Sequence, residues 1–239
     1  MVETFAEQFD TAFTQGSYPI PLLPDHSRVQ NSIETIRFTA EKIEEALKNM
    51  KRDSSPGPDN IPTIFLQNCS NSVSPLLSEV MQECLEQGKI PDAWKNSIVT
   101  PLFKKGDRHK PENYRPISLT CNSLNCMEKI IVKELITFFL ENNLIPYSQH
   151  GFLSKRSTTT NLLECLNDWT QSHDNGQPTD IIYLDNKKAF EEVPHSLLIA
   201  KLEHFGVRGK LLDLIKSLLY ERCYQVRVNG KLSSPQSEQ

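Results

Sequence analysis

The chain has 239 residues, of which 38% are hydrophobic and 23% charged, a composition typical of one or two globular domains with a sizeable core. It carries 26 Lys and Arg against 30 Asp and Glu and has no run of 18 apolar residues, which excludes bulk basicity and a membrane-spanning helix. The acidic excess lies within residues 1–50, and the rest of the chain is neutral overall. Any affinity for nucleic acid must therefore come from a local basic patch.

The first 38 residues have weak hydrophobic periodicity and a proline-rich piece, Tyr18 to His26, so we interpret them as a partly ordered lead-in. A helix is predicted next, with Thr39 as its N-cap. The segment SSPGPDNIP, residues 54–62, cannot be helical because it holds three prolines and a glycine. The apolar residues that recur at helical spacing in the predicted helix are Ile43, Ala46, Leu47 and Met50.

A second helix is predicted from about Ser74, with Pro75 at its first position and Gly88 just beyond its end. Residues 97–103 form an expected strand that leads through a polar, basic turn into a return strand at residues 114–119. The predicted apolar stripe of the helix consists of Val73, Leu76, Leu77, Val80 and Cys84.

The second half of the chain alternates helices with short strands. Helices are predicted at about residues 123–142, 158–172, 197–205 and 210–220. The run DIIYLD, Asp180 to Asp185, is rich in β-forming residues and predicts a buried strand. A last strand, Tyr224 to Val228, is followed by Asn229-Gly230, the strongest short signal for a hairpin turn.

Six cysteines are spread along the chain without a Cys-x-x-Cys pair or a Cys/His cluster at zinc spacing. We interpret them as scattered reduced thiols, and we predict neither a disulfide nor a zinc site.

Two local features could carry chemistry. Asp185 ends the predicted strand, although an isolated Asp in that place is more often a turn or helix cap. The turn between the hairpin strands has a net charge of +3 over residues 103–115, although such a turn is more often a solvated surface loop than a phosphate site. The cations of this turn are Lys104, Lys105, Arg108, Lys110 and Arg115.

Taken in order, six short strings carry a stronger signal than any of them alone. SSPGPDNIP, VTPLFKKGD, NYRPISLT, QHGF with RST, YLDNKKAF and VNG together resemble the reverse transcriptase domain of non-LTR (LINE-type, jockey-like) retrotransposons. The resemblance covers about Ser54 to Ser234. It implies an RNA-directed DNA polymerase that uses an RNA template, a DNA primer, dNTPs and Mg²⁺.

The implied fold is α+β, with the right-hand architecture of polymerases. Residues 1–53 would be a partly ordered connector, and residues 54–179 a fingers-like region, mostly helical with a basic β-hairpin. Residues 180–239 would be the first part of an incomplete palm sheet, ending before the double-aspartate motif of the family.

The resemblance also assigns roles to residues. Asp185 would be a catalytic carboxylate and a ligand of Mg²⁺, and phosphoryl transfer does require hard oxygen ligands of this kind. The fingers hairpin would contact nucleotide phosphates, and Phe190 would be the steric gate against a ribose 2′-OH. The implied nucleotide-binding residues are Lys104, Lys105, Arg115, Asn186 and Phe190, and the implied template-binding residues are Gly151, Phe152, Arg156 and Ser157.

The chain departs from the family pattern in several places. The family usually has an apolar residue where Asn186 stands, a small or acidic residue at Lys187, Asp at Glu191, and Arg at Leu153. The local fit around Asp185 is therefore poorer than in typical members, while Asp185 itself is kept.

Two functions stay open at this point: a segment of a reverse transcriptase that is inactive alone, and a non-catalytic transposon-derived remnant with at most weak nucleic-acid binding. The two-metal mechanism needs carboxylates from two motifs, and only one of three expected carboxylates is seen. We therefore expect the purified chain to give no template-dependent primer extension with an RNA template, dNTPs and Mg²⁺. Extension by clean protein would refute this expectation. An intracellular, nuclear location is implied by the resemblance alone.

Overall fold

The computed structural model describes residues 2–10, 31–185 and 193–238. These residues form two compact units, which are described separately. The first unit contains the described residues up to Glu134 together with those from 193 onward, and the second contains residues 135–185. The three polymerase regions expected from the sequence have other bounds and stay a prediction, since compactness alone does not test them.

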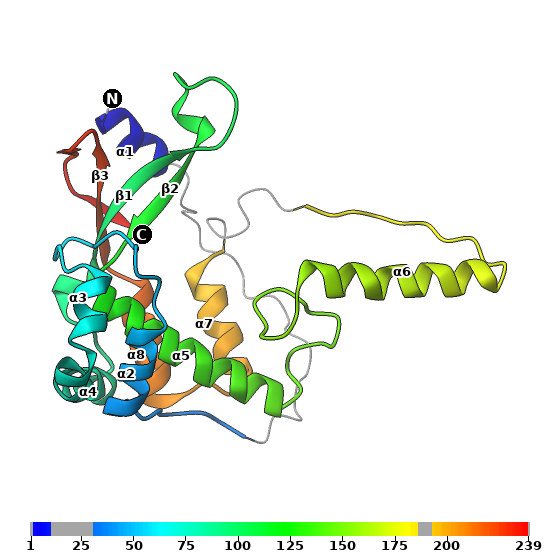
Figure 1. The fold of residues 1–239 in the computed structure, drawn as a ribbon, viewed down its shortest axis with the longest axis horizontal. Coiled ribbons are helices and arrows are strands. Elements are labelled where there is room, and N and C mark those ends of the chain that lie inside the picture. Colours follow the sequence, from blue (N-terminus) through cyan, green and yellow to red (C-terminus); the bar gives the residue numbers. More distant parts are fainter. Residues whose placement is uncertain (1, 11–30, 186–192, 239) are drawn as a thin grey trace. The chain divides into compact units, whose positions relative to one another are not determined.

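Helices form one part of the first unit (Figure 1). They are α2 (Ala40–Lys48), α3 (Thr63–Asn68), α4 (Ser70–Gln87), α7 (His195–His204), α8 (Gly209–Leu219) and the first part of α5 (Asn122–Glu141). Helix α2 packs on α4, and α4 packs on α8. As predicted, the Thr39 hydroxyl caps α2 by accepting the Lys42 N–H at 3.3 Å. Gly88, in the left-handed region with φ 65°, ends α4.

The start of α4 corrects the sequence prediction. The helix begins at Ser70, so that Pro75 lies inside it rather than at its first position. Pro75 removes one backbone donor, and nearby the Ser74 hydroxyl donates to the Ser70 carbonyl at 2.6 Å. Leu76, predicted to be in the apolar stripe, is 62% exposed. Because proline favours the first turn of a helix, Pro75 led to a predicted start at Ser74, about one turn later than the observed start at Ser70.

The sheet of the first unit has the strand order β2-β1-β3-β4, and β5 also pairs with β3. As predicted, β1 (Asn96–Phe103) and β2 (Tyr114–Leu119) form an antiparallel hairpin. Strand β3 (Arg222–Val228) runs parallel to β1. Asn229 (φ 51°) and Gly230 (φ 78°) form the predicted tight turn into β4 (Lys231–Leu232), and β5 comprises Gln236–Glu238.

A helix at the N-terminus, α1 (Val2–Asp10), covers one face of this sheet (Figure 1). Its buried residues Phe5, Ala6 and Phe9 form a core with Val99, Tyr224 and Val226. Hydrogen bonds from the Ser234 N–H and hydroxyl, at 3.0 and 2.9 Å, lower the pKa of Glu3 at the start of the helix. The sequence prediction missed α1, although Val2, Phe5, Ala6 and Phe9 recur at helical spacing. A helix of nine residues is not stable alone, and this one depends on packing against strands about 90 residues or more away in the sequence.

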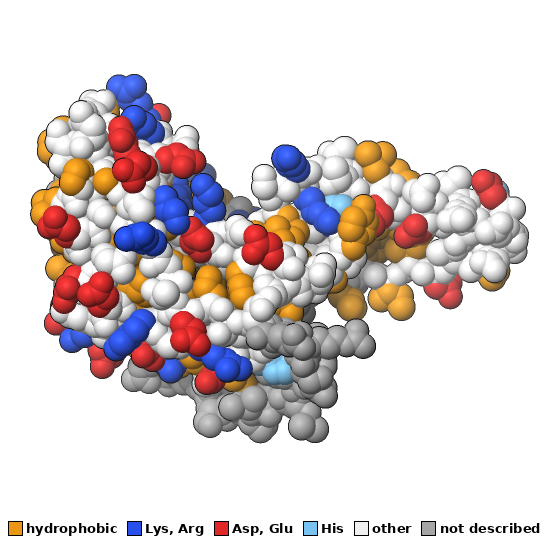
Figure 2. Space-filling view, turned by 90° about the horizontal axis from the view of Figure 1, so that it is seen from below, with side chains coloured by type: hydrophobic (Ala, Val, Ile, Leu, Met, Phe, Trp, Pro, Cys, Tyr) orange, Lys and Arg blue, Asp and Glu red, His pale blue; other side chains and the backbone are white. Residues whose placement is uncertain are grey.

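Helix α6 (Thr158–Asp174) is the main element of the second unit and agrees with the predicted helix at 158–172. Its leucines Leu162, Leu163 and Leu166 are each more than half exposed, and Figure 2 shows orange side chains lying open along this helix. Among the described residues, no helix is both long and apolar enough to cross a membrane.

The predicted buried strand at residues 180–185 is wrong. These residues have no regular secondary structure, and Ile182, Tyr183 and Leu184 are 81%, 83% and 91% exposed. A strand becomes stable through hydrogen bonds to a neighbouring strand and through cover on its faces. Within the described parts of the chain, no backbone hydrogen bonds join this segment to a neighbouring strand. Its β-forming composition alone therefore does not make it a strand.

All six cysteines are free thiols, and Cys84, Cys121 and Cys126 are buried. Burial raises the pKa of the Cys126 thiol to about 11, which leaves it protonated and unreactive at neutral pH.

Candidate nucleic-acid interface

The tip of the β1–β2 hairpin is an ordered basic loop in the first unit. The Lys104 N–H donates to the Asn113 carbonyl at 2.9 Å and so extends the ladder beyond Phe103 and Tyr114, which are paired. The Asn113 side chain donates to the Asp107 carbonyl at 2.8 Å. Gly106 has φ 90°, and a Cβ there would lie 2.9 Å from the Asn113 amide, so the tip requires glycine. These contacts define a single tip conformation.

Aromatic rings support the same hairpin on the side that faces α1. The Tyr114 ring packs edge-on against Phe5 at 4.9 Å and against Phe103 at 5.4 Å. The Arg108 guanidinium lies 4.9 Å from the centre of the Phe103 ring, and the Tyr114 hydroxyl donates to the Arg108 carbonyl at 2.9 Å. Arg108 therefore helps to hold the hairpin together, in addition to carrying positive charge.

The opposite face of the hairpin carries two of the predicted nucleotide-binding cations, Lys104 and Arg115, and Lys105 follows in the turn. Arg115 pairs with Leu102 in the register, and because strand side chains alternate, Lys104 and Arg115 project away from the Tyr114 face. Lys104, Lys105 and Arg115 are exposed, and no ion pair to any of them is found in the described parts of the chain. Leu102 and Ile117 on the same face are 55% and 41% exposed. The face thus combines positive charge with apolar surface.

The predicted template-binding residues lie in the second unit, at the start of α6. Ser157 is the N-cap: its hydroxyl accepts the Thr160 N–H at 3.2 Å, and the Thr160 hydroxyl accepts the Ser157 N–H at 2.9 Å. This capping box occupies one of the otherwise free N–H groups at the start of the helix. Gly151 and Phe152 are exposed on the preceding loop.

Arg156 is turned toward its own loop. One guanidinium nitrogen donates to the carbonyls of Tyr147 and Gln149, the latter at 3.0 Å, and the guanidinium carbon lies 4.7 Å from the centre of the Tyr147 ring. In this arrangement Arg156 organises the loop, and its charge is close to any group that approaches Tyr147.

A hydroxyl–imidazole–carboxylate row occurs beside this loop. The His150 ring lies 3.0 Å from the Thr160 hydroxyl through Nδ1 and 2.5 Å from a Glu164 carboxylate oxygen through Nε2. The Thr160 hydroxyl also donates to the Ser157 carbonyl at 2.8 Å and belongs to the capping box. A hydroxyl with this many partners is not available as a nucleophile, so the row anchors the loop to α6. Sequence reasoning did not identify Tyr147, His150 or Glu164, although QHGF pointed to their neighbourhood.

Asp185 lies at the end of the exposed segment of the second unit. Asn186 and Phe190 are outside the described residues. Among the residues described, no group of three His, Cys, Asp or Glu side chains is placed to hold a metal ion. Asp185 is the one described residue that the motifs assign to Mg²⁺, and it would supply a hard carboxylate oxygen of the kind that Mg²⁺ prefers, so it stays a predicted ligand.

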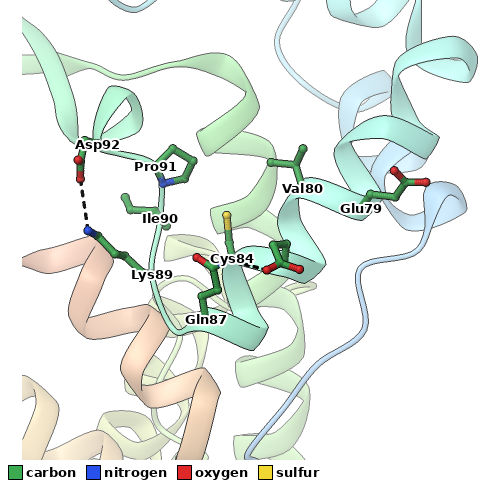
Figure 3. A pocket seen from close by; sticks show the side chains of 9 residues that line it. Glu79, Val80, Cys84, Gln87, Lys89, Ile90, Pro91 and Asp92 are labelled. Carbon is green, nitrogen blue, oxygen red and sulfur yellow. Dashed lines mark hydrogen bonds and ion pairs between the residues drawn. The ribbon is translucent and has the colours of Figure 1, made fainter.

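A pocket of about 570 Å³ lies elsewhere, between α4 and residues 89–92 (Figure 3). Three carboxylates line it, from Glu79, Glu83 and Asp92, with Lys89 held 3.9 Å from Asp92. Buried Cys84 also lines it, and burial raises the pKa of that thiol. The negative charge of this pocket has the wrong sign for nucleic acid, so the pocket is not a candidate interface.

Comparison with known proteins identifies the family of the chain. Residues 103–239 match the family described as reverse transcriptase (RNA-dependent DNA polymerase). The match covers more than half of the chain, so the chain belongs to the reverse transcriptase family, as the motifs predicted.

Relatives extend the similarity to nearly the whole chain. It is 27% identical over 238 residues to a probable RNA-directed DNA polymerase from transposon BS, and 26% identical over 239 residues to the RNA-directed DNA polymerase from mobile element jockey, both from Drosophila melanogaster. Each alignment covers 97% of this chain and 26% of the relative. A polyprotein of the type-1 retrotransposable element R2 from Popillia japonica is 28% identical over 189 residues, which cover 79% of this chain and 25% of the relative. The chain thus spans about a quarter of the length of these relatives.

Proposed function

We propose that this chain is the part of a retrotransposon RNA-directed DNA polymerase that holds the template and the phosphates of incoming nucleotides. The observation that carries the proposal is the outer face of the β1–β2 hairpin, where Lys104 and Arg115 are exposed beside apolar Leu102 and Ile117, with exposed Lys105 in the adjoining turn. Phosphates require cations, while bases and sugars favour apolar surface, and this face offers both.

The finer assignments of the family belong to this proposal. Residues 54–179 would be the fingers and residues 180–239 the beginning of the palm. Asp185 would be a catalytic carboxylate, with Asn186 and Phe190 beside the incoming nucleotide. Gly151, Phe152, Arg156 and Ser157 would lie along the template. The substrates would be an RNA template, a DNA primer and dNTPs, with Mg²⁺ as the metal.

The test is the salt dependence of RNA binding. The affinity of the chain for a 12-nucleotide single-stranded RNA is measured at several KCl concentrations, for the wild type and for the triple variant Lys104→Ala, Lys105→Ala, Arg115→Ala. Each lost phosphate contact reduces the slope of log K against log[salt] by about 0.7 for single strands. We expect the triple variant to bind more weakly and its slope to be shallower by about 2 units.

A charge-matched variant is the control. Lys51, Lys129 and Lys210 are exposed lysines elsewhere in the first unit, and their joint replacement by Ala changes the net charge equally. This control should keep the wild-type slope. An unchanged slope in the hairpin variant, or an equal change in the control, would show that the hairpin is only a solvated loop.

A further inference from the structure

The loop from Tyr147 to Ser157 is more firmly held than its exposure suggests. Arg156 bonds two of its carbonyls, His150 is clamped between Thr160 and Glu164, and the capping box fixes its last residue. The Gln149 amide also donates to the Gly151 carbonyl at 3.1 Å. A surface loop with this many internal bonds presents its remaining side chains in fixed positions.

The backbone of the loop contains two unfavourable conformations. Phe152 (φ 64°) and Lys155 (φ 63°) both lie in the left-handed region, which is rare for residues other than Gly, Asn and Asp. Each is less favourable than ordinary backbone geometry, because Cβ comes close to the neighbouring carbonyl oxygen. The hydrogen bonds of Arg156 and His150 and the capping box at Ser157 offset this strain. Backbone strain that is maintained in this way is characteristic of binding loops.

The fixed loop presents aromatic rings to the outside. Tyr147 is 78% exposed and Phe152 is 83% exposed. Burying such rings in a core would stabilise the fold, and the loop does not do so. The Arg156 guanidinium against Tyr147 adds positive charge to one ring.

The charged residues around these rings are positive, which favours a negatively charged partner. Residues 142–163 contain Lys155 and Arg156 and no Asp or Glu. The first carboxylate after this stretch, Glu164, is occupied by His150. An aromatic surface within a purely cationic stretch complements a polyanion with flat apolar groups, which is the chemistry of unpaired nucleotides.

We infer that the loop from Tyr147 to Ser157 is a stacking platform for the unpaired bases of a single-stranded nucleic acid, with Tyr147 as its principal ring. The inference deepens the proposed function and rests on it, since it names how the template region is held. Arg156 orients Tyr147 and supplies the neighbouring charge, and His150 with Glu164 anchors the loop to α6. Double-stranded RNA, whose bases are already stacked, should not use this surface.

The test compares Tyr147→Ala with Tyr147→Phe in the same RNA-binding assay. Loss of one base-stacking contact corresponds to about 1–3 kcal/mol, so Tyr147→Ala should weaken binding of the 12-nucleotide RNA by roughly 5- to 150-fold. The salt slope should stay at the wild-type value, because no phosphate contact is removed. Tyr147→Phe keeps the ring and should bind like the wild type, and duplex RNA should bind both variants equally.

Tyr183→Ala is the matched control, because Tyr183 is an equally exposed tyrosine of the same unit, outside the loop. It should bind RNA like the wild type. If Tyr147→Ala binds normally while the hairpin triple variant still loses salt dependence, the platform is refuted and the proposed function stands. Equal losses for Tyr147→Phe and Tyr147→Ala, or a loss for duplex RNA as well, would also overturn the platform, since neither depends on a stacking ring.

Discussion

Replacing Gly57 by Ala should destabilise the first unit by about 3 kcal/mol, the upper end of the usual range for overpacked sites. Gly57 is buried in the proline-rich segment of residues 54–62. A Cβ at this position would lie 2.4 Å from the carbonyl carbon of Thr120 and 2.6 Å from the amide nitrogen of Cys121. Both atoms are backbone, so no side-chain rotation can relieve the clash. The segment would have to move away from the start of α5.

Urea unfolding followed by circular dichroism measures this effect as a lower midpoint. Gly151→Ala is the control, because its new methyl group would meet only the flexible Gln149 side chain, at 3.3 Å. That variant should change stability by less than about 0.5 kcal/mol. If Gly57→Ala were as mild as the control, the packing of residues 54–62 on α5 would not be tight in solution.

The elements that the sequence predicted well are those with local signals. Thr39 as a cap, Gly88 as a helix end, and Asn229-Gly230 as a turn each act within a few residues, and each is found where it was predicted. The β1–β2 hairpin was predicted correctly for the same reason, since a polar, basic turn separates two short runs of β-forming residues. Local chemistry is fully visible in the sequence.

The errors concern elements whose state depends on distant partners. Residues 180–185 have the composition of a strand, but composition does not provide a neighbouring strand. Helix α1 has only nine residues, and its existence depends on a sheet face formed by β1 and β3. The parallel pairing of these two strands joins residues more than 120 positions apart, which no short motif indicates.

The candidate site was predicted only where it depends on local sequence. The cations of the hairpin follow from local sequence, whereas the inward turn of Arg156 depends on the folded path of its loop. The anchoring of His150 by Glu164 needed the helix start at Thr158, which brings residues 14 apart into contact. Tyr147 gave no signal beforehand, because an exposed tyrosine has meaning only once its loop is known to be fixed.

The second large effect is expected for Phe9→Ala, which should lower the free energy of unfolding of the first unit by about 3–5 kcal/mol, the usual cost of truncating a buried Phe. Phe9 is 2% exposed and shares a core with Tyr224 and Val226 on the sheet face. Truncation leaves a cavity at the far end of a nine-residue helix, and a helix of that length is not stable without its packing.

Two measurements report the loss of stability in Phe9→Ala. The urea midpoint should fall strongly, and the amide protons of β3 should exchange with solvent faster, because α1 no longer covers the strand. Glu7→Ala, an exposed position on the same helix, controls for composition and should leave both measurements near their wild-type values. A loss below about 1 kcal/mol for Phe9→Ala would mean that α1 adds little to the sheet. In that case the hairpin that carries Lys104 and Arg115 would depend for its order on the β1–β3 pairing, and the ring contact between Phe5 and Tyr114 would be dispensable.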